Sequence, residues 1–307
     1  MEWELGLILG SKTRARGDGS KGVKMLLIVN NADVNAQCGF YGSALQAASS
    51  KGREKAVQLL LNNNADVNAQ CGFYGSALQA ASIWGYENIV QLLLENNADV
   101  NAQGGEYRSA LQAASAGGHE KIVQLLLENN ADVNAQSEQD GNALQAASAG
   151  GHQKVVQLLL KNNADVNAQC GFYGSALQAA SAEGHKKIVQ LLIDKNADVN
   201  AQGGQYGNAL QAASEAGYEK IVQLLIINNA DVNAEGGECG SALQAASAGG
   251  HEKIVQLLLE TNADVNAEGG EYGNALQAAS ARGHEKVVQL LLNKIQANES
   301  ITGIIVV

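Results

Sequence analysis

The chain contains no proline among its 307 residues, where average usage would give roughly fifteen. This absence excludes collagen-like, polyproline and mucin-like chains, and it leaves glycine, asparagine and serine to form the turns. Aromatic residues are also scarce, at 4%, whereas hydrophobic residues make up 46% of the chain. A core of this composition has to be built from alanine and aliphatic side chains, which is typical of a helical protein.

Basic residues are few and apolar stretches are short. The 20 lysines and arginines stand against 31 acids, and the net charge of −11 argues against nucleic acid and anionic membranes as partners. The run Ile304–Val307 is among the longest apolar stretches, far below the ~20 residues of a membrane span. The first five residues carry acids where a secretory signal has bases. We therefore expect a cytoplasmic protein, and in any case an intracellular one, with a nuclear location left open.

An internal repeat determines the expected architecture. The string Ala-Leu-Gln-Ala-Ala-Ser occurs eight times, and its leucines recur every 33 residues from Leu45 to Leu276. The string Asn-Ala-Asp-Val-Asn-Ala keeps the same step between Asp33 and Asp264. Length alone would suggest two domains, but a repeat of this period indicates one solenoid in which each unit packs on its neighbours.

Each unit predicts a hairpin-like loop followed by a short first helix. In the unit that starts at Asp99, the stretch as far as Tyr107 is rich in Asn, Asp and Gly, which is typical of turns. Ser109 and Gln112 have the spacing of a capping box, in which each side chain bonds a backbone amide of the other residue. The helix that follows has an apolar face made mostly of methyl groups, and two glycines end it.

A second helix is predicted after the glycines. It begins near His119 and Glu120, where an acid favours the positive end of the helix dipole, and its Ile, Val and Leu residues form a buried stripe. An asparagine at one fixed position, such as Asn97, is expected to end each such helix in the left-handed conformation. Helices of about ten residues are marginal alone, so neighbouring units have to stabilise them.

These features together resemble ankyrin repeats. The 33-residue step, the Gly-His before the second helix, the run Ile-Val-Gln-Leu-Leu-Leu and the turn Ala-Asp-Val-Asn-Ala carry the resemblance. The family's Thr-Pro-Leu-His helix start reads Ser-Ala-Leu-Gln or Asn-Ala-Leu-Gln here, so alanine occupies the proline position, as at Ala44 and Ala77. The near-identity of the copies is similar to the ankyrin arrays of filamentous fungi. The resemblance implies an all-α repeat solenoid, a stack of helix-turn-helix units with short β-hairpin loops.

Three regions are expected along the chain. Residues 1–18 form an atypical N-terminal segment, and residues 19–292 form a single ankyrin-repeat domain of a degenerate half unit and eight 33-residue units. Residues 293–307 form a degenerate C-terminal end, in which the Asn-Ala-Asp turn is lost and the last four residues are apolar. Since solenoids normally end in units with polar outer faces, this end suggests a fragment, an unusual cap or a site covered by another chain.

Residues that recur at one position of nearly every unit are most simply required by the fold. The five histidines share one position, and helices 8–10 Å apart cannot bring neighbouring copies onto one zinc ion, so interhelical hydrogen bonds are expected. The four cysteines are expected to be free thiols, since adjacent units exceed the reach of a disulfide. The repeated Asp-Val-Asn is expected to form Asx-turns rather than a calcium loop. We expect no catalytic, metal or cofactor site and no small-molecule substrate.

The positions that vary between units are therefore the informative ones. They lie at the hairpin tips and at the end of the first helix, which in an ankyrin-like stack line the tips and the concave face. Exposed aromatic and arginine side chains dominate the energetics of many protein interfaces. For the tip tyrosines, stacking on one another along the array is an equal alternative. The candidate partner-binding residues are Phe40, Tyr41, Phe73, Tyr74, Ile83, Trp84, Tyr107, Arg108, Phe172, Tyr173, Tyr206, Tyr272 and Arg282.

The sequence thus predicts a non-enzymatic scaffold that binds a protein partner through its hairpin tips and concave helix face. An alternative is a sensor or regulatory segment of a larger nucleotide-binding or enzymatic fungal protein, suggested by the degenerate first unit and the apolar end. A third hypothesis, an enzyme in its own right, lacks a unique acid–base pair, nucleophile or metal cluster in the sequence.

Overall fold

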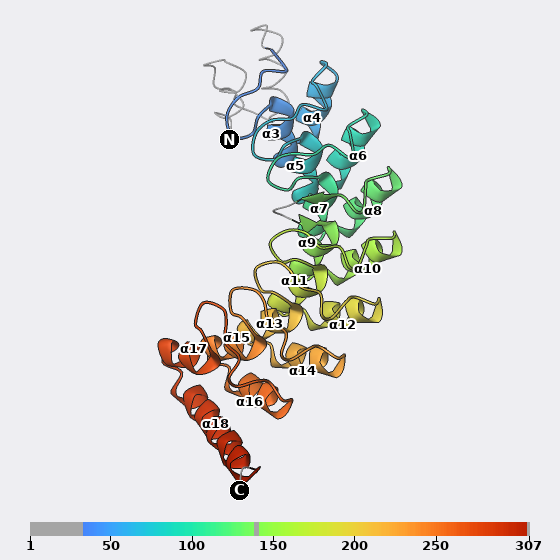
Figure 1. The fold of residues 1–307 in the computed structure, drawn as a ribbon. Coiled ribbons are helices and arrows are strands. Elements are labelled where there is room, and N and C mark those ends of the chain that lie inside the picture. Colours follow the sequence, from blue (N-terminus) through green and yellow to red (C-terminus); the bar gives the residue numbers. More distant parts are fainter. Residues whose placement is uncertain (1–32, 138–140, 306–307) are drawn as a thin grey trace. The chain divides into compact units, whose positions relative to one another are not determined.

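The structure, a computed structural model, describes residues 33–137 and 141–305. The atypical segment 1–18, the half unit expected from residue 19 and the helix-ending Asn31 lie outside these residues. Sixteen helices in the described residues form consecutive pairs, which confirms the predicted all-α repeat fold (Figure 1). The chain divides into two compact units: unit 1 runs up to Ala135 and includes Lys154–Ala164, and unit 2 contains Gln136–Gln153 and the residues from Asp165 onward.

The first helix of each repeat begins directly after a serine or asparagine cap, as predicted. Ser109 Oγ accepts a hydrogen bond from the Gln112 backbone amide at 3.1 Å, and the reciprocal capping box is complete at Ser43, Asn142 and Asn274. These caps satisfy amides that would otherwise lack a partner at the helix start. The first helices are α3 (Ala44–Ser50), α5 (Ala77–Ile83), α7 (Ala110–Ala116), α9 (Ala143–Ala149), α11 (Ala176–Ala182), α13 (Ala209–Glu215), α15 (Ala242–Gly249) and α17 (Ala275–Arg282).

The second helices carry the predicted Ile, Val and Leu stripe, with residues such as Ile122, Val123 and Leu126 buried. In the seven full turns that follow a second helix, an asparagine with φ between 61° and 68° reverses the chain, as predicted. The second helices are α4 (Glu54–Leu61), α6 (Glu87–Glu95), α8 (Glu120–Glu128), α10 (Gln153–Lys161), α12 (Lys186–Asp194), α14 (Glu219–Ile227), α16 (Glu252–Glu260) and α18 (Glu285–Ile305).

The last of these helices is longer than the others. α18 continues beyond residue 292 to Ile305. The asparagine turn that ends the other second helices is missing here, and the residues from Asn293 to Thr302 contain neither glycine nor proline. The position of the left-handed asparagine, Asn262 in the preceding repeat, is Ile295 here. A β-branched residue does not adopt the left-handed conformation, so the helix continues.

Successive repeats pack helix on helix within each unit. In unit 1, α3 packs against α5 and α5 against α7, and in unit 2 the same contact runs through α9, α11, α13, α15 and α17. The side chains on the facing surfaces are small, because each helix contributes buried alanines, such as Ala113 and Ala114, and one leucine. Alanine surfaces allow the helix backbones to approach closely. Aromatic side chains would not fit between helices packed in this way, which agrees with their scarcity in the sequence.

The loop before each first helix is a short hairpin, as the resemblance implied. In one loop it contains two strands, β1 (Gln136–Ser137) and β2 (Gly141–Asn142), paired antiparallel. In six others a single antiparallel bridge closes it, and in the loop before α7 a hydrogen bond from Gly104 N to Arg108 O at 2.9 Å does so. The six bridges are Cys38↔Gly42, Cys71↔Gly75, Cys170↔Gly174, Gly203↔Gly207, Gly236↔Gly240 and Gly269↔Gly273. The glycine at the end of each bridge has a positive φ, such as 87° at Gly42, which L-residues rarely adopt.

A buried glutamine connects the first helix to the hairpin of the following repeat, as at α3 and α13. Gln46 Nε2 donates to Cys71 O at 2.8 Å and to Gly75 O at 2.7 Å in unit 1. In unit 2, Gln211 Nε2 donates to Gly236 O at 3.0 Å and to Gly240 O at 2.8 Å. Buried carbonyls need such partners, so the glutamine that sequence analysis assigned only to capping also fixes the next hairpin.

The Asx-turns predicted in the Asp-Val-Asn segments are present, and they also join neighbouring repeats. Asn68 N donates to Asp66 Oδ1 at 2.9 Å, which closes the local turn. The Asn68 side chain then donates to Asn97 O at 3.2 Å and accepts from Asp99 N at 2.7 Å in the next repeat. One polar side chain therefore sets both the turn and its distance from the next turn.

The periodic histidines also have the structural role expected of them. His119 Nε2 donates to Ile83 O at 2.9 Å, and the ring packs on Gly85, where an added Cβ would lie 2.5 Å from it. In unit 2, His251 Nε2 donates to Glu215 O at 2.8 Å in the same way. The ring thus covers the end of the preceding first helix and satisfies one of its terminal carbonyls.

Candidate partner-binding face

The hairpin tips within each unit are joined by backbone hydrogen bonds. In unit 1, Phe73 N donates to Phe40 O at 2.8 Å, and Glu106 N donates to Phe73 O at 2.9 Å. In unit 2 the same bonds connect Phe172 to Gln205, Gln205 to Glu238 and Glu238 to Glu271, at 2.9 to 3.1 Å. Each tip is therefore fixed relative to the next, and the side chains it carries form a continuous row within the unit.

Aromatic residues concentrate in two adjacent positions of this row. All three phenylalanines of the chain occupy the first tip position, and six of its eight tyrosines occupy either the second tip position or its equivalents in later repeats. In unit 1 the Phe40 and Phe73 rings stack at 4.8 Å between centroids, and Tyr41 and Tyr74 stack at 6.5 Å. The alternative that tip aromatics stack along the array is therefore confirmed here. Stacking leaves the outer phenylalanine faces open, with Phe40 57% and Phe73 37% exposed.

The tip tyrosine also contacts the residue ten positions later, at the end of the first helix. Trp84 Nε1 donates to Tyr74 Oη at 3.2 Å, and Lys51 Nζ lies 5.2 Å from the centroid of Tyr41. Trp84 remains 54% exposed. Tyr74, by contrast, is buried at 7% exposure, so its expected place on an exposed surface is wrong. The side chains around Tyr74 cover it, and it contacts both Trp84, through its hydroxyl, and Phe73, through its ring.

Three other candidate partner-binding residues of unit 1 are only half-buried. Ile83 and Tyr107 are half-buried, and the Ile83 carbonyl accepts the bond from His119. Arg108 occupies the position that is glycine in the other repeats and has a φ of 57°. The Arg108 carbonyl accepts a hydrogen bond from Gln79 Nε2 at 2.7 Å, and Arg108 is half-buried. Arg108 thus breaks the sequence pattern at a position that the backbone geometry constrains.

In unit 2 the same positions combine an aromatic ring with acids. Phe172 is 52% exposed, and the half-buried Tyr173 donates from Oη to Glu183 Oε1 at 2.7 Å. The Tyr173 and Tyr206 rings stack at 6.3 Å. Burial raises the pKa of Tyr173, and the bond to Glu183 raises it further. The phenol therefore remains a neutral donor that holds the carboxylate in place.

The last two tips of unit 2 carry Cys239 and Tyr272 in the tyrosine position. Burial, followed by the charge and hydrogen bond of Glu215, raises the pKa of the Cys239 thiol to about 12. The Arg282 guanidinium lies 5.3 Å from the Tyr272 centroid and donates from Nε to its Oη at 3.1 Å. Arg282 is exposed, and Tyr272 is half-buried.

The sequence analysis missed the role of the helix-end residues Lys51 and Glu183, although it noted that these positions vary. The signal that could have found them is the constant ten-residue spacing from the tip tyrosine, which the pairs Tyr74–Trp84 and Tyr272–Arg282 share. One turn of loop and one short helix separate the two positions, so the spacing is a property of the fold.

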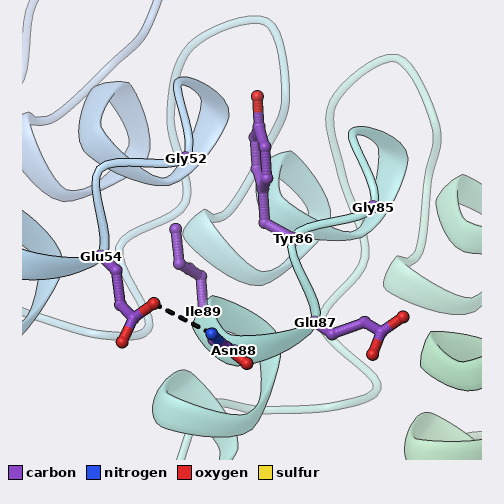
Figure 2. Close-up of a pocket in the computed structure, with 7 residues that line it drawn as sticks. All are labelled: Gly52, Glu54, Gly85, Tyr86, Glu87, Asn88 and Ile89. Atoms are coloured by element: carbon purple, nitrogen blue, oxygen red, sulfur yellow. Dashed lines mark hydrogen bonds between the residues drawn. The ribbon is translucent and has the colours of Figure 1, made fainter.

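A pocket of about 260 Å³ lies in unit 1, away from the tip row (Figure 2). It is lined by Gly52, Glu54, Gly85, Tyr86, Glu87, Asn88 and Ile89. Figure 2 shows Asn88 pointing to Glu54, and its Nδ2 donates to Glu54 Oε2 at 3.1 Å. In residues 33–137 and 141–305, no three His, Cys, Asp or Glu side chains are grouped so that they could hold a metal ion. Among the helices of these residues, none combines the length and apolar character needed to cross a membrane.

Comparison with known proteins agrees with this geometry. The family model for ankyrin repeats, which spans three copies, matches residues 14–104, 102–170, 168–236 and 234–301. A search of curated proteins finds no match. Ankyrin repeats are generally protein–protein interaction modules and typically non-catalytic. With a matched family model along most of its length and a repeat geometry of paired helices and short hairpins, the chain belongs to the ankyrin repeat family.

Proposed function

We propose that the chain is a non-catalytic scaffold that binds a protein partner through its hairpin tips and the adjacent ends of its first helices. The observation that carries the proposal is the exposure of Phe40, Phe73 and Trp84 in unit 1, at 57%, 37% and 54%. Large aromatic side chains in a cluster on the surface are typical of interface hot spots. In a chain with so few aromatic residues, their placement on one row favours this role.

The tips have the rigidity that binding requires. Phe73 is held by backbone bonds to the tips on either side, and its ring stacks on Phe40. Trp84 is fixed by its bond to the buried Tyr74. Because these side chains are ordered before a partner arrives, less conformational entropy is lost on binding.

Unit 2 offers a second contact of different chemistry. Phe172 is exposed in the same tip position, Glu238 and Glu271 follow along the row, and Glu183 lies at the adjacent end of a first helix. An aromatic ring beside carboxylates suits a partner surface that combines apolar and basic side chains. In the proposed scaffold the side chains at the tips therefore contact the partner, while the first helices hold the tips in a constant geometry.

The test is affinity capture with the intact chain and with the double variant Phe73→Ala, Trp84→Ala. Ile227→Ala is the matched control, since Ile227 is 78% exposed on α14 but belongs to a second helix. Tyr74 is left unchanged because it is buried and its removal would disturb the support. The double variant should lose the captured proteins by at least about tenfold, the effect of removing two hot-spot side chains.

Helical circular dichroism should be the same for all three proteins. If the double variant captures the same proteins at the same level as the intact chain, the tips are not the binding surface. An equal loss in the Ile227→Ala control would likewise contradict the assignment.

A further inference from the structure

Charged side chains connect the starts of the second helices from one repeat to the next. The first residue of a second helix is usually glutamate, and the second residue of the following second helix is usually lysine. These two positions form four ion pairs in the described residues: Lys121–Glu87 at 3.3 Å, Lys154–Glu120 at 3.4 Å, Lys253–Glu219 at 3.7 Å and Lys286–Glu252 at 3.1 Å. The Glu54–Asn88 bond of the pocket is a further member of this Glu–Lys ladder.

Unit 2 contains two consecutive breaks in the ladder. The glutamate position is Gln153 at the start of α10 and Lys186 at the start of α12. By the register of the other repeats, Lys187 takes the position opposite Gln153, and Lys220 on α14 takes the position opposite Lys186. In the part of the chain that the structure describes, no ion pair involves Lys186, Lys187 or Lys220.

The acids nearest in sequence already have partners. Glu183, three residues before Lys186, accepts a bond from Tyr173 Oη at 2.7 Å. Glu219, next to Lys220, already pairs with Lys253 at 3.7 Å and accepts a bond from Gln223 Nε2 at 3.2 Å. Lys186 is also the first residue of α12, where a positive charge opposes the helix dipole and the other repeats have glutamate or glutamine. The arrangement is therefore unfavourable for the isolated chain, and a bound anion would relieve the like-charge contact between Lys186 and Lys220 and supply the missing partner of Lys187.

We propose that Lys186, Lys187 and Lys220 form a docking site for an acidic segment of a partner protein. The lysine position, held here by Lys187 and Lys220, binds a carboxylate within the chain four times in other repeats, at 3.1 to 3.7 Å, so a glutamate or aspartate from the partner completes the ladder at its two breaks. All three lysines are exposed. The site lies on the second helices and is independent of the hairpin tips.

A short acidic peptide segment fits this site better than a long polyanion. The three lysines stand in a chain of net charge −11, and an extended nucleic acid or an anionic membrane would also approach the surrounding acids. A segment with two or three carboxylates meets only the local positive charge. Tyr218, 38% exposed beside Lys220, adds an apolar contact for such a peptide.

The test measures binding of a fluorescein-labelled hexaglutamate peptide to the full chain by fluorescence anisotropy at low ionic strength. Lys186→Glu restores a ladder pair with Lys220 and should weaken binding at least about tenfold, since it removes one positive charge and adds a negative one. Lys195→Glu makes the same charge change at the other end of α12 and should stay within about twofold of the intact chain. Gln153→Glu, which supplies the missing acid to Lys187, should give a loss between these two.

The melting temperature of Lys186→Glu should equal or exceed that of the intact chain, because the variant removes a like-charge contact. A lower melting temperature, or a Lys195→Glu variant that loses as much affinity as Lys186→Glu, would overturn the proposal. Phosphatidylserine vesicles and single-stranded RNA serve as competing probes. If either probe binds the intact chain more tightly than hexaglutamate does, and binds the Lys186→Glu variant more weakly, the site recognises that polyanion rather than an acidic peptide.

Discussion

The hairpin tips of unit 1 and unit 2 occupy the same positions of the repeat but have different contents. Unit 1 presents stacked rings, with Phe40 on Phe73 and Trp84 bound to Tyr74. Unit 2 presents one exposed ring, Phe172, and a series of acids. The backbone bonds between tips have the same lengths in both units, near 3 Å. The comparison shows that one support can display two different surfaces, and under the proposed function the tip side chains decide what the hairpin row recognises.

The Glu–Lys ladder gives a second difference of the same kind. It is continuous in the described repeats of unit 1, from Glu54–Asn88 to Glu120–Lys154, and broken in unit 2 at Gln153 and Lys186. The helix length does not change at the breaks, since α12 and α14 both have nine residues. Charge can therefore vary at these positions without a cost to the repeat geometry.

The buried glutamine tests whether the support is the same in both units, and it has the largest expected effect. Gln46→Ala in unit 1 and Gln211→Ala in unit 2 each remove bonds to two or more carbonyls of the next hairpin. Each should lower the free energy of unfolding by about 2–3 kcal/mol, because buried carbonyls lose their donor. Urea denaturation followed by circular dichroism measures it.

Gln277→Ala is the matched control, since no hairpin follows it in the described residues and its side chain is exposed. It accepts a bond from Asn274 N at its own helix start, so its loss should cost only about 0.5–1 kcal/mol. A Gln277→Ala loss as large as that of Gln46→Ala would mean that capping, rather than the bond to the next hairpin, is the main role.

Cys239 sharpens the comparison through its chemistry, because no tip of unit 1 has a thiol beside acids. With its pKa raised to about 12 by burial and Glu215, its thiolate fraction at pH 8 should be about 100-fold or more below that of an ordinary cysteine. Iodoacetamide labelling with peptide mass spectrometry should modify the exposed Cys38 first. Glu215→Gln should speed the labelling of Cys239, and an unchanged rate would contradict the assigned cause.

The same shift predicts a pH dependence of stability. The folded pKa of Cys239 lies above the unfolded value of 9.0, so the folded state retains its proton when the unfolded state has lost it. The stabilising contribution is complete below about pH 9 and is lost as the pH rises toward 12. Thermal melts of the intact chain and Cys239→Ser between pH 8 and 11 measure this, and the intact chain should lose more stability across the range.

The histidine position should again show equal effects in both units. His119→Ala and His251→Ala remove a bond to Ile83 O and Glu215 O, respectively, together with the ring packed on the preceding glycine. Each should cost about 1–2 kcal/mol, measured by urea denaturation. A difference of more than about 1 kcal/mol between the two would show that the support is not the same in the two units.

The smallest effect is expected from the intact ladder pairs. Lys121→Ala in unit 1 and Lys253→Ala in unit 2 each break an ion pair between exposed side chains. Each should cost about 0.2–0.5 kcal/mol, and the difference should vanish in high salt. A loss above about 1 kcal/mol would mean that the ladder holds the repeats together, which would change the interpretation of its breaks.

Much of the fold could be predicted from the sequence because its signals are local. The cap at Ser109, the left-handed asparagine at Asn97 and the histidine packed on the preceding helix follow from residue type and periodicity. The bond from Gln46 to the next hairpin could not be derived in this way, because its partners are backbone atoms 25 and 29 residues away. A polar residue kept in the middle of an apolar helix was the available signal.

The candidate face could be predicted only in outline. The tip and helix-end positions are those the sequence indicated, but the burial of Tyr74 depends on rings from the preceding repeat and on Trp84. The loss of the turn after residue 292 was visible in the sequence, but the continuation of α18 to Ile305 was not predicted from it. The break in the Glu–Lys ladder was visible in the sequence as Lys186 at a glutamate position, but its meaning required the ion pairs of the other repeats.

We propose that the side chains at the tips, and not the first helices that support them, decide which proteins the hairpin row binds. The most direct measurement is quantitative affinity capture with three versions of the chain: intact, Phe40→Gln with Phe73→Gln in unit 1, and Phe172→Gln in unit 2. Glutamine already occupies this tip position at Gln205, so the repeat tolerates it. The two variants should keep the melting temperature of the intact chain and lose captured proteins, each a different part of the set. Identical proteins captured at equal levels by all three versions would contradict the account.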